Sequence, residues 1–306
     1  MKRVAVGLKV GDCREQEFDA PTAGRIPHPR ECLPRRPARV PTYEPRRDRR
    51  DAGRRPLPRG ALEGWHSPRL VASPNLGHMR VNFNYRNYFT TAAGYGEKPR
   101  RAQYFEGPYE LALFRFLEMS TRIVDYQFQP LQIQWETSSG QTVSYTTDVI
   151  YATETAEIGV EEVKATNAYF EQAETHDLLA LFEAEIEKEG ARFYRRNGRH
   201  LVDRAIWRTV KDAFDDRRTA YSDQDVERVR EVIVREGGAA PLGPIVDGLH
   251  VSSRQGLAML NAMMVQRLVG FDLVRPPTAD TIVTIPPAAA DPNALRSFLR
   301  RYATTA

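Results

Sequence analysis

The sequence predicts an α/β protein in which helices flank a mixed sheet and a small helical module follows. Three observations lead to this prediction. Between residues 108 and 196 the hydrophobic pattern gives a helix, three strands, a second helix and a further strand. The composition changes at residues 219–222, after which short helical patterns return. Before the first helix, 11 of the 21 prolines fall within residues 1–75, where no helical or strand period is found.

Residues 1–78 are therefore expected to form a disordered basic arm, with order beginning near Arg80. Residues 1–60 hold 16 Lys and Arg against 8 Asp and Glu, a net charge of +8, and arginines crowd between Arg25 and Arg59. Two interpretations stay open: an electrostatic arm for DNA or a protein partner, or a solvated leader that arises from an upstream start codon. Both cysteines, Cys13 and Cys32, lie here, so neither a disulfide framework nor a Cys-x-x-Cys metal site is expected. A reducing cytoplasm is the expected compartment.

The rest of the chain is mildly acidic. Residues 61–306 hold 28 Lys and Arg against 32 Asp and Glu, a net charge of −4. This opposes nucleic-acid binding, because attraction to phosphates is its main sequence-independent contribution. No apolar run approaches the roughly 20 residues that a membrane-spanning helix needs, so no membrane association is expected.

A helix is expected at residues 108–120, PYELALFRFLEMS, with Pro108 in the first turn, where proline is tolerated. Its apolar residues recur at helical spacing. Glu110 lies in the first turn, and the local sequence alone favours an interaction with the helix dipole. Lys98, Arg100 and Arg101 come just before the helix, which makes them candidate DNA contacts.

Strands follow the helix. Residues 122–135 form an extended segment, a turn is expected at residues 138–140, and strands are expected at residues 141–151 and 157–165. A long amphipathic helix at residues 168–189 ends at Gly190, and residues 191–196 form a short strand.

The two middle strands carry a candidate site. Glu162 and Lys164 face the same way because strand side chains alternate, and a hairpin would bring Asp148 beside them. Two carboxylates are hard oxygen ligands suited to Mg²⁺, and a lysine can orient the attacking water. This set of groups suits metal-assisted phosphodiester hydrolysis. The alternative is an ordinary hairpin with solvated Glu162 and Lys164.

Residues 219–306 are expected to form a winged helix-turn-helix domain. Helices are predicted after Ser222, at residues 241–249 and at residues 252–269, followed by strand, turn and strand at residues 271–286. Ser253, Arg254 and Gln255 lie at the start of the third helix, where groove-reading side chains usually sit. Docking of a partner protein is an equally open interpretation of this domain.

This order of elements, with Glu on the first helix, Asp on a middle strand and Glu-x-Lys on the next, resembles the PD-(D/E)XK nuclease core. Residues 85–215 further resemble the TnsA-like endonuclease subunit of heteromeric transposases. The resemblance rests on Arg86-Asn87, Lys98, GPYELALFRFLE, Val124-Asp125-Tyr126 with Gln129-Pro130, TTDVI and EEVKA. The sequence departs from the family in Thr147, which replaces the proline of the PD pair, and in the long basic arm.

The resemblance implies a restriction-endonuclease-like fold of residues 79–218 and a catalytic role for Glu110, Asp148 and Lys164. Glu162 stands where the family has Gln or Glu. The metal, Mg²⁺ with Mn²⁺ as a substitute, would be bound by Glu110, Asp148, Glu162 and a backbone carbonyl near Val163. Lys164 would position the hydrolytic water.

The same resemblance implies cleavage of double-stranded DNA at transposon 5′ ends in the bacterial cytoplasm, at the nucleoid. A TnsB-like DDE transposase would cut the 3′ ends, and a TnsC-like ATPase would license both. Two alternatives are a stand-alone defence or restriction nuclease and a non-catalytic DNA-binding regulator on a nuclease scaffold.

Overall fold

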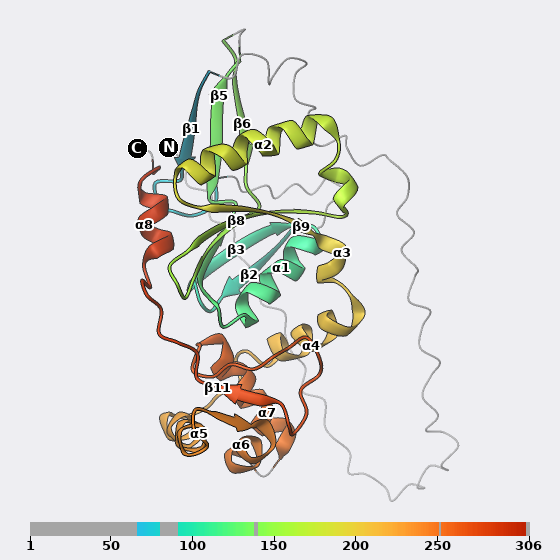
Figure 1. Cartoon of the computed structure of the whole chain (residues 1–306), viewed down its shortest axis with the longest axis vertical. Helices are drawn as coiled ribbons and strands as arrows, with labels where there is room; N and C mark the ends of the chain where they lie inside the picture. The colour runs from blue at the N-terminus through green and yellow to red at the C-terminus, as the bar shows by residue number, and fades with distance from the viewer. Residues whose placement is uncertain (1–65, 80–90, 138–139, 251, 304–306) are drawn as a thin grey trace, which may run out of the picture. The chain divides into compact units, whose positions relative to one another are not determined.

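A four-stranded sheet organises the chain in the computed structural model, which describes residues 66–79, 91–137, 140–250 and 252–303 (Figure 1). All of these residues belong to one compact unit, residues 50–306. In spatial order the strands are β4 (Ile123–Phe128), β7 (Val149–Thr153), β8 (Ile158–Lys164) and β9 (Arg192–Asn197). The first three are antiparallel, whereas β8 and β9 are parallel. The parallel pair requires a crossover, which helix α2 (Ala173–Lys188) supplies after the short 3₁₀ turn η3 (Asn167–Tyr169).

The chain enters this sheet from helix α1 (Pro108–Met119), which confirms the helix expected there. Along the chain the sheet is therefore built as a helix, three antiparallel strands, a helix and a parallel strand. The two helices contact different apolar clusters. Val163 of β8 belongs to the cluster that contains α1, and Val160 of the same strand belongs to the cluster that contains α2. This is the alternation of faces expected for a strand buried on both sides.

A second, three-stranded antiparallel sheet is formed by β1 (His66–Ala72), β5 (Leu131–Glu136) and β6 (Thr142–Thr146). Strands β5 and β6 are inserted between β4 and β7. The expectation of disorder up to residue 78 is wrong for β1, because Leu70, Val71 and Ala72 pair with β5 and Ala72 is fully buried. The rest of the expected arm, residues 1–65, lies outside the described residues, as do residues 80–90 with Arg86-Asn87 and the turn residues Ser138-Ser139.

The single strand expected at residues 141–151 is two strands, β6 and β7, in different sheets. The chain changes sheets at Thr147 and Asp148. The amide of Thr147 donates to the carbonyl of Leu131 at 3.1 Å, and the carbonyl of Asp148 accepts from the amide of Gln129 at 2.9 Å. These two bonds fix Asp148 at the beginning of β7. Separately, β2 (Thr91–Gly96) and β3 (Arg101–Glu106) form an antiparallel hairpin ahead of α1.

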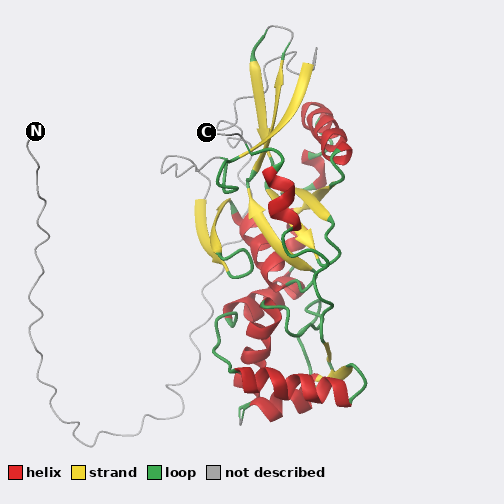
Figure 2. Cartoon of the chain, turned by 90° about the vertical axis from the view of Figure 1, so that its left-hand side faces the viewer, coloured by secondary structure: helices red, strands yellow, loops and turns green. Residues whose placement is uncertain are grey.

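The chain after β9 is mostly helical (Figure 2). Its elements are α3 (Gly198–Leu201), α4 (Arg204–Asp215), α5 (Asp223–Arg235), β10 (Ala239–Pro241), α6 (Leu242–Leu249), α7 (Ser253–Val265), β11 (Ile282–Thr284) and α8 (Ala294–Arg300). The helix expected after Ser222 is confirmed. Ser222 caps it through a reciprocal capping box with Asp225.

The β-hairpin expected at residues 271–286 is only half formed. β11 pairs with β10 instead of with residues 271–274. The Asp272 side chain accepts the Val274 amide at 2.8 Å, which turns the chain there. Pro276 and Pro277 follow and have no amide to donate to a ladder. An isolated bridge between Gly270 and Thr284 is the remaining contact between the two segments.

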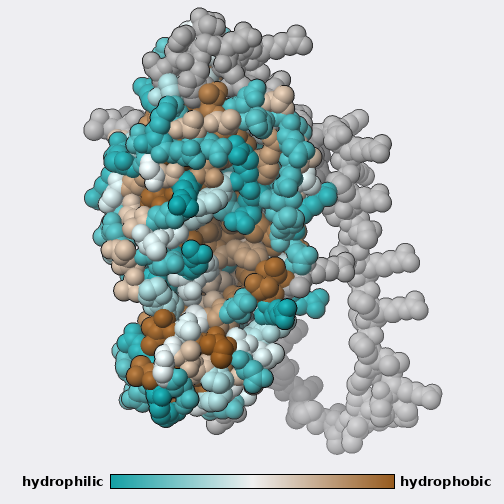
Figure 3. All heavy atoms as spheres, viewed as in Figure 1, coloured by the Kyte–Doolittle hydropathy of each residue, from teal (hydrophilic) through white to brown (hydrophobic). Residues whose placement is uncertain are grey.

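Helix α8 packs back on the sheet rather than with the helices that precede it. Leu295, Phe298 and Leu299 are buried in the same cluster as α2 and β8, and the Tyr302 carbonyl accepts the Ala72 amide at 2.8 Å. The C-terminal module expected at residues 219–306 therefore does not include this helix. Some apolar side chains of the module remain exposed, notably Val234, Val274, Ile282 and Ile285, and hydrophobic residues are visible on that part of the surface in Figure 3.

None of the helices in the described part of the chain is both long and apolar enough to cross a membrane.

Candidate functional site

The site expected from the sequence gathers where β7 begins and β8 ends. Asp148 is 2% exposed, and its Oδ2 accepts the backbone amide of Val163 at 2.8 Å. The same oxygen lies 3.9 Å from the Nζ of Lys164. The side chain of Asp148 therefore takes the place of a ladder partner beyond the last paired residues of β7 and β8, and this holds its carboxylate against the end of β8.

Glu162 and Lys164 lie on the same face of β8, as the alternation of side chains predicts. The Lys164 ammonium donates a hydrogen bond to Glu162 Oε1 and forms an ion pair with it. Glu162 is 1% exposed, whereas Lys164 is partly exposed. One ammonium therefore contacts two carboxylates, Asp148 and Glu162, and is accessible to solvent at the same place.

Glu110 reaches the site from the first turn of α1. The helix begins after Gly107, whose φ of 91° favours glycine, and Pro108 occupies the first turn. Glu110 Oε2 accepts the backbone amide of Glu106 at 2.9 Å, which holds the carboxylate back over the helix start. Both roles weighed for Glu110 from the sequence are compatible with this position.

The pKa of the Glu110 carboxyl is set by its burial and by the charges around it. Burial raises the pKa of the Glu110 carboxyl well above its ordinary value, and the negative charge of Asp148 raises this pKa further. The Glu106 amide and the Lys164 charge act in the opposite direction but do not compensate. A buried carboxyl whose pKa is raised by a second carboxylate is typical of functional sites.

The donor chemistry of these residues fits a hard divalent cation. Carboxylate and carbonyl oxygens are the ligands of Mg²⁺, and a cation would relieve the repulsion between Glu110 and Asp148. The N–H and C=O of one strand residue face the same edge, so the Val163 carbonyl lies on the edge where Asp148 accepts the Val163 amide. Among the described residues, no three His, Cys, Asp or Glu side chains are already arranged to hold a metal. In the present arrangement the single Lys164 ammonium contacts both Asp148 and Glu162 and offsets part of their negative charge.

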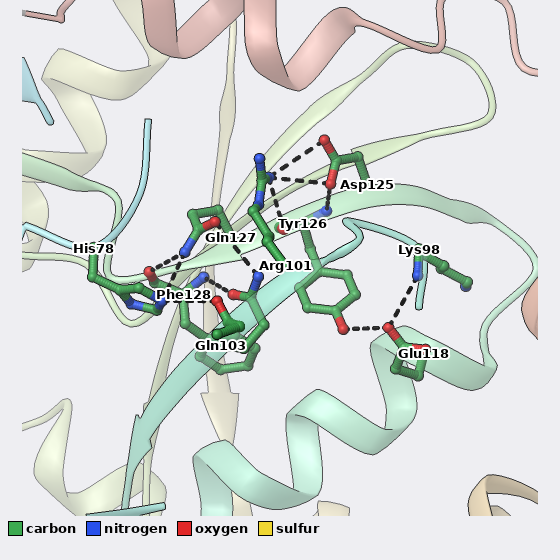
Figure 4. A network of polar contacts seen from close by, with 10 residues as sticks. His78, Lys98, Arg101, Gln103, Glu118, Asp125, Tyr126, Gln127 and Phe128 are labelled. Carbon is green, nitrogen blue, oxygen red and sulfur yellow. Dashed lines mark hydrogen bonds and ion pairs between the residues drawn. The ribbon is translucent and has the colours of Figure 1, made fainter. Parts of the chain in front are cut away.

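The basic residues ahead of α1 lie in a second polar network, and two of them do not project into solvent. Lys98 Nζ donates to the carbonyls of Leu117 and Ser120, at 2.8 and 2.5 Å, and so caps the end of α1. Arg101 forms an ion pair with Asp125 at 3.2 Å (Figure 4). These contacts argue against the predicted phosphate contacts for Lys98 and Arg101.

Arg100 is exposed and has a φ of 51°. Of the three basic residues ahead of α1, it alone keeps the accessibility that a phosphate contact needs.

The candidate DNA-reading residues of α7 are exposed, as expected, but two of them have protein partners. Arg254 binds both carboxylate oxygens of Asp216 at 2.7 Å, and the Ser253 hydroxyl donates to Asp247 at 3.1 Å. Gln255 is exposed beside them. In this structure Arg254 connects α7 to the end of α4, so a base contact would require that the ion pair first break.

Sequence reasoning missed the residues that join β9 and α3 to the site. Asn197 is the register partner of Lys164 across the parallel β8–β9 pair. A Cβ on the next residue, Gly198, would lie 2.5 Å from Cγ of Tyr109, the neighbour of Glu110 on α1. The absence of a side chain at Gly198 therefore lets α3 approach the first turn of α1. The run of arginines at residues 192–199 is the feature of the sequence that points to this segment.

Comparison with protein-family models and with curated proteins gives no match for this chain.

Proposed function

We propose that this protein is a metal-dependent DNA endonuclease that hydrolyses phosphodiester bonds. The observation that carries the proposal is the convergence of Glu110, Asp148, Glu162 and Lys164 from α1, β7 and β8. The order of elements is also that of a PD-(D/E)XK core: helix α1, the antiparallel strands β4, β7 and β8, helix α2 and the parallel strand β9. This order supports the proposal, because it brings four side chains that are distant in sequence to the same end of the sheet.

Each residue has a role that follows from its place. Asp148 and Glu162, with Glu110 and the Val163 carbonyl, would hold Mg²⁺ or Mn²⁺. When bound, such an ion supplies Lewis-acid polarisation of a phosphate and charge stabilisation. Lys164, which contacts both carboxylates and is accessible to solvent, would orient the attacking water and offset phosphate charge.

The transposase context rests on the sequence motifs. We propose that the protein cuts transposon 5′ ends in bacteria, with a TnsB-like DDE transposase and a TnsC-like ATPase as partners. The helices α5, α6 and α7 with β10 and β11 are compatible with the small winged-helix domain proposed for the C-terminal part. A stand-alone nuclease would use the same site residues, so its distinction lies in activity without partners.

Nicking of supercoiled plasmid by the full chain with Mg²⁺ or Mn²⁺, with and without the two partners, tests the proposal. We expect Asp148→Asn and Lys164→Ala to lower the rate by about 10²- to 10⁴-fold, the range for loss of a positioned catalytic group. Asp215→Asn and Lys188→Ala, which change exposed residues of α4 and α2, are matched controls.

Cleavage only with the partners supports the transposase assignment, and specific cleavage without them favours the stand-alone nuclease. Folded wild-type protein that binds DNA but never cuts it, with either metal and with the partners, would overturn the enzyme proposal. The non-catalytic regulator would then remain.

A further inference from the structure

The segment from β9 into α3 carries a local concentration of positive charge in an acidic part of the chain. Residues 192–200, RFYRRNGRH, contain four Arg, one His and no Asp or Glu. Residues 61–306 as a whole have a net charge of −4. A polyanion approaching this part of the protein would therefore meet favourable potential at few places, and residues 192–200 supply one of them.

The arginines of this segment fall into two groups. Three of them form ion pairs: Arg192 with Glu157 at 3.4 Å, Arg195 with Glu183 at 2.6 Å, and Arg196 with the buried Glu161 at 2.5 Å. Arg199 and His200 are exposed, and within the described part of the chain neither forms an ion pair. The Arg199 charge is therefore not neutralised by a neighbouring carboxylate among the described residues. We name the pair Arg199 and His200 the α3 rim.

The α3 rim is fixed to the candidate site by two independent contacts. Asn197, the register partner of Lys164, accepts the Arg199 amide on its side-chain oxygen at 3.1 Å. Neighbouring strands lie about 4.8 Å apart, so Asn197 lies one strand spacing from the Lys164 backbone, and the rim begins two residues later. Gly198 packs on Tyr109, next to Glu110. Figure 1 shows α3 beside α1 and the end of β9.

From this placement we propose that the α3 rim binds the phosphate backbone of duplex DNA next to the scissile phosphate. The inference rests on the proposed nuclease function and adds the surface that holds the substrate. Arginine presents a planar fork of donors that matches phosphate geometry. Residues 61–306 have a net negative charge, which opposes binding of DNA. The rim answers this difficulty, because it places a cationic contact where the strand would be cut.

Binding of the full chain to a fluorescent DNA duplex, without divalent metal and at several salt concentrations, tests the inference. In an Arg199→Glu/His200→Glu double variant we expect affinity to fall by about tenfold or more. The slope of log affinity against log salt should decrease by about one to two, since each phosphate contact contributes about 0.9. Arg300→Glu changes an exposed arginine of α8 on the opposite side of the view in Figure 1 and is the matched control.

Both residues are exposed, so the double variant should fold, which circular dichroism would check. If it does not, the milder Arg199→Gln/His200→Gln variant replaces it, and Arg199→Lys should restore part of the affinity. Equal affinity and salt slope in the double variant, the control and wild type would overturn the inference, as would no binding of duplex by wild type.

The two proposals fail separately. Loss of binding in the rim variant, together with a wild-type protein that never cuts, retains the DNA surface and rejects the nuclease. Cutting by wild type, together with unchanged binding in the rim variant, retains the nuclease and rejects the α3 rim as the DNA surface.

Discussion

Helix α1 carries a buried glutamate at each end, Glu110 in its first turn and Glu118 in its last, and the two have opposite surroundings. Burial raises the pKa of both carboxyl groups. Glu118 is fully buried and accepts the Tyr126 hydroxyl and, at 3.4 Å, the Lys98 amide. The charge with the largest effect on Glu118 is the positive charge of Lys98, which lowers the pKa of the carboxyl. For Glu110 the charge with the largest effect is the negative charge of Asp148, which raises the pKa.

The difference separates a stabilising network at one end of α1 from the candidate functional site at the other. At the end of α1 the helix dipole disfavours a carboxylate, and Lys98 compensates by donating to two helix carbonyls while lying near Glu118. Glu118, Lys98 and Tyr126 thus form a closed network of opposite charges and hydrogen bonds. At the start of α1 two carboxylates are kept close together, which costs stability unless a cation binds. Groups retained at such a cost are typical of functional sites.

The largest effect on stability should come from opening the closed network. Burial lowers the pKa of Lys98 to about 7, against the opposing effect of Glu118. Lys98→Met would leave the carbonyls of Leu117 and Ser120 without their ammonium donor, and it would remove the positive charge that acts on Glu118. We expect a loss of about 1–3 kcal/mol in the free energy of unfolding, the cost of leaving buried acceptors without a donor. Urea unfolding would measure it.

Lys188→Met is the matched control, because the Lys188 ammonium is exposed and, among the residues that the structure describes, pairs only with Glu185. It should change the unfolding free energy by less than about 0.5 kcal/mol. A Lys98→Met variant as stable as this control would show that the network contributes little to stability. The end of α1 that carries Glu118 could then not be called a stabilising site.

The sequence could predict most of the site but little of the closed network. Residue spacing placed Glu162 and Lys164 on one face and Asp148 beside them, because strand alternation and hairpin pairing are local rules. The roles of Lys98 and Arg101 could not be read this way. Whether a basic residue caps a helix or meets solvent depends on the path of the β2–β3 hairpin, which brings Lys98 to the end of α1.

The fold shows the same limit. The order of helices and strands was predictable from periodicity, whereas the division of residues 141–151 between two sheets was not. That division depends on long-range backbone bonds at Thr147 and Asp148. The return of α8 to the sheet depends likewise on contacts made across more than a hundred residues, such as Tyr302 with Glu189.

A smaller effect of opposite sign is expected at the other end of α1. Because the folded-state pKa of Glu110 is raised, the folded protein retains a proton that the unfolded chain releases. Wild-type stability should therefore fall as pH rises from the ordinary glutamate range, about 4.3, through the raised pKa. Glu110→Gln removes this loss. We expect the metal-free variant to be more stable than wild type at pH 8 by about 1 kcal/mol, or roughly 2–4 °C in Tm, with a smaller difference near pH 4.

Glu118→Gln is the control that sharpens the comparison. It removes a carboxylate of similar burial, yet near pH 6, where Lys98 is charged, it should destabilise the protein, since it deprives Lys98 of its counter-charge. Calorimetry of both variants across this pH range would compare them. Destabilisation by Glu110→Gln at pH 8 would mean that Glu110 is held by satisfied interactions, and the distinction between the two glutamates would then fail.

The smallest effect on the free energy of unfolding is expected for an ion pair that is exposed to solvent. Arg254 binds Asp216 through two bonds, but its side chain is 65% exposed, so solvent screens the pair. Arg254→Ala should cost less than about 1 kcal/mol in urea unfolding. Burial, more than the number of bonds, would then set the cost at each site. A loss as large as that of Lys98→Met would contradict this ordering. Reduced affinity for duplex DNA with unchanged stability would instead assign Arg254 the groove contact predicted from the sequence.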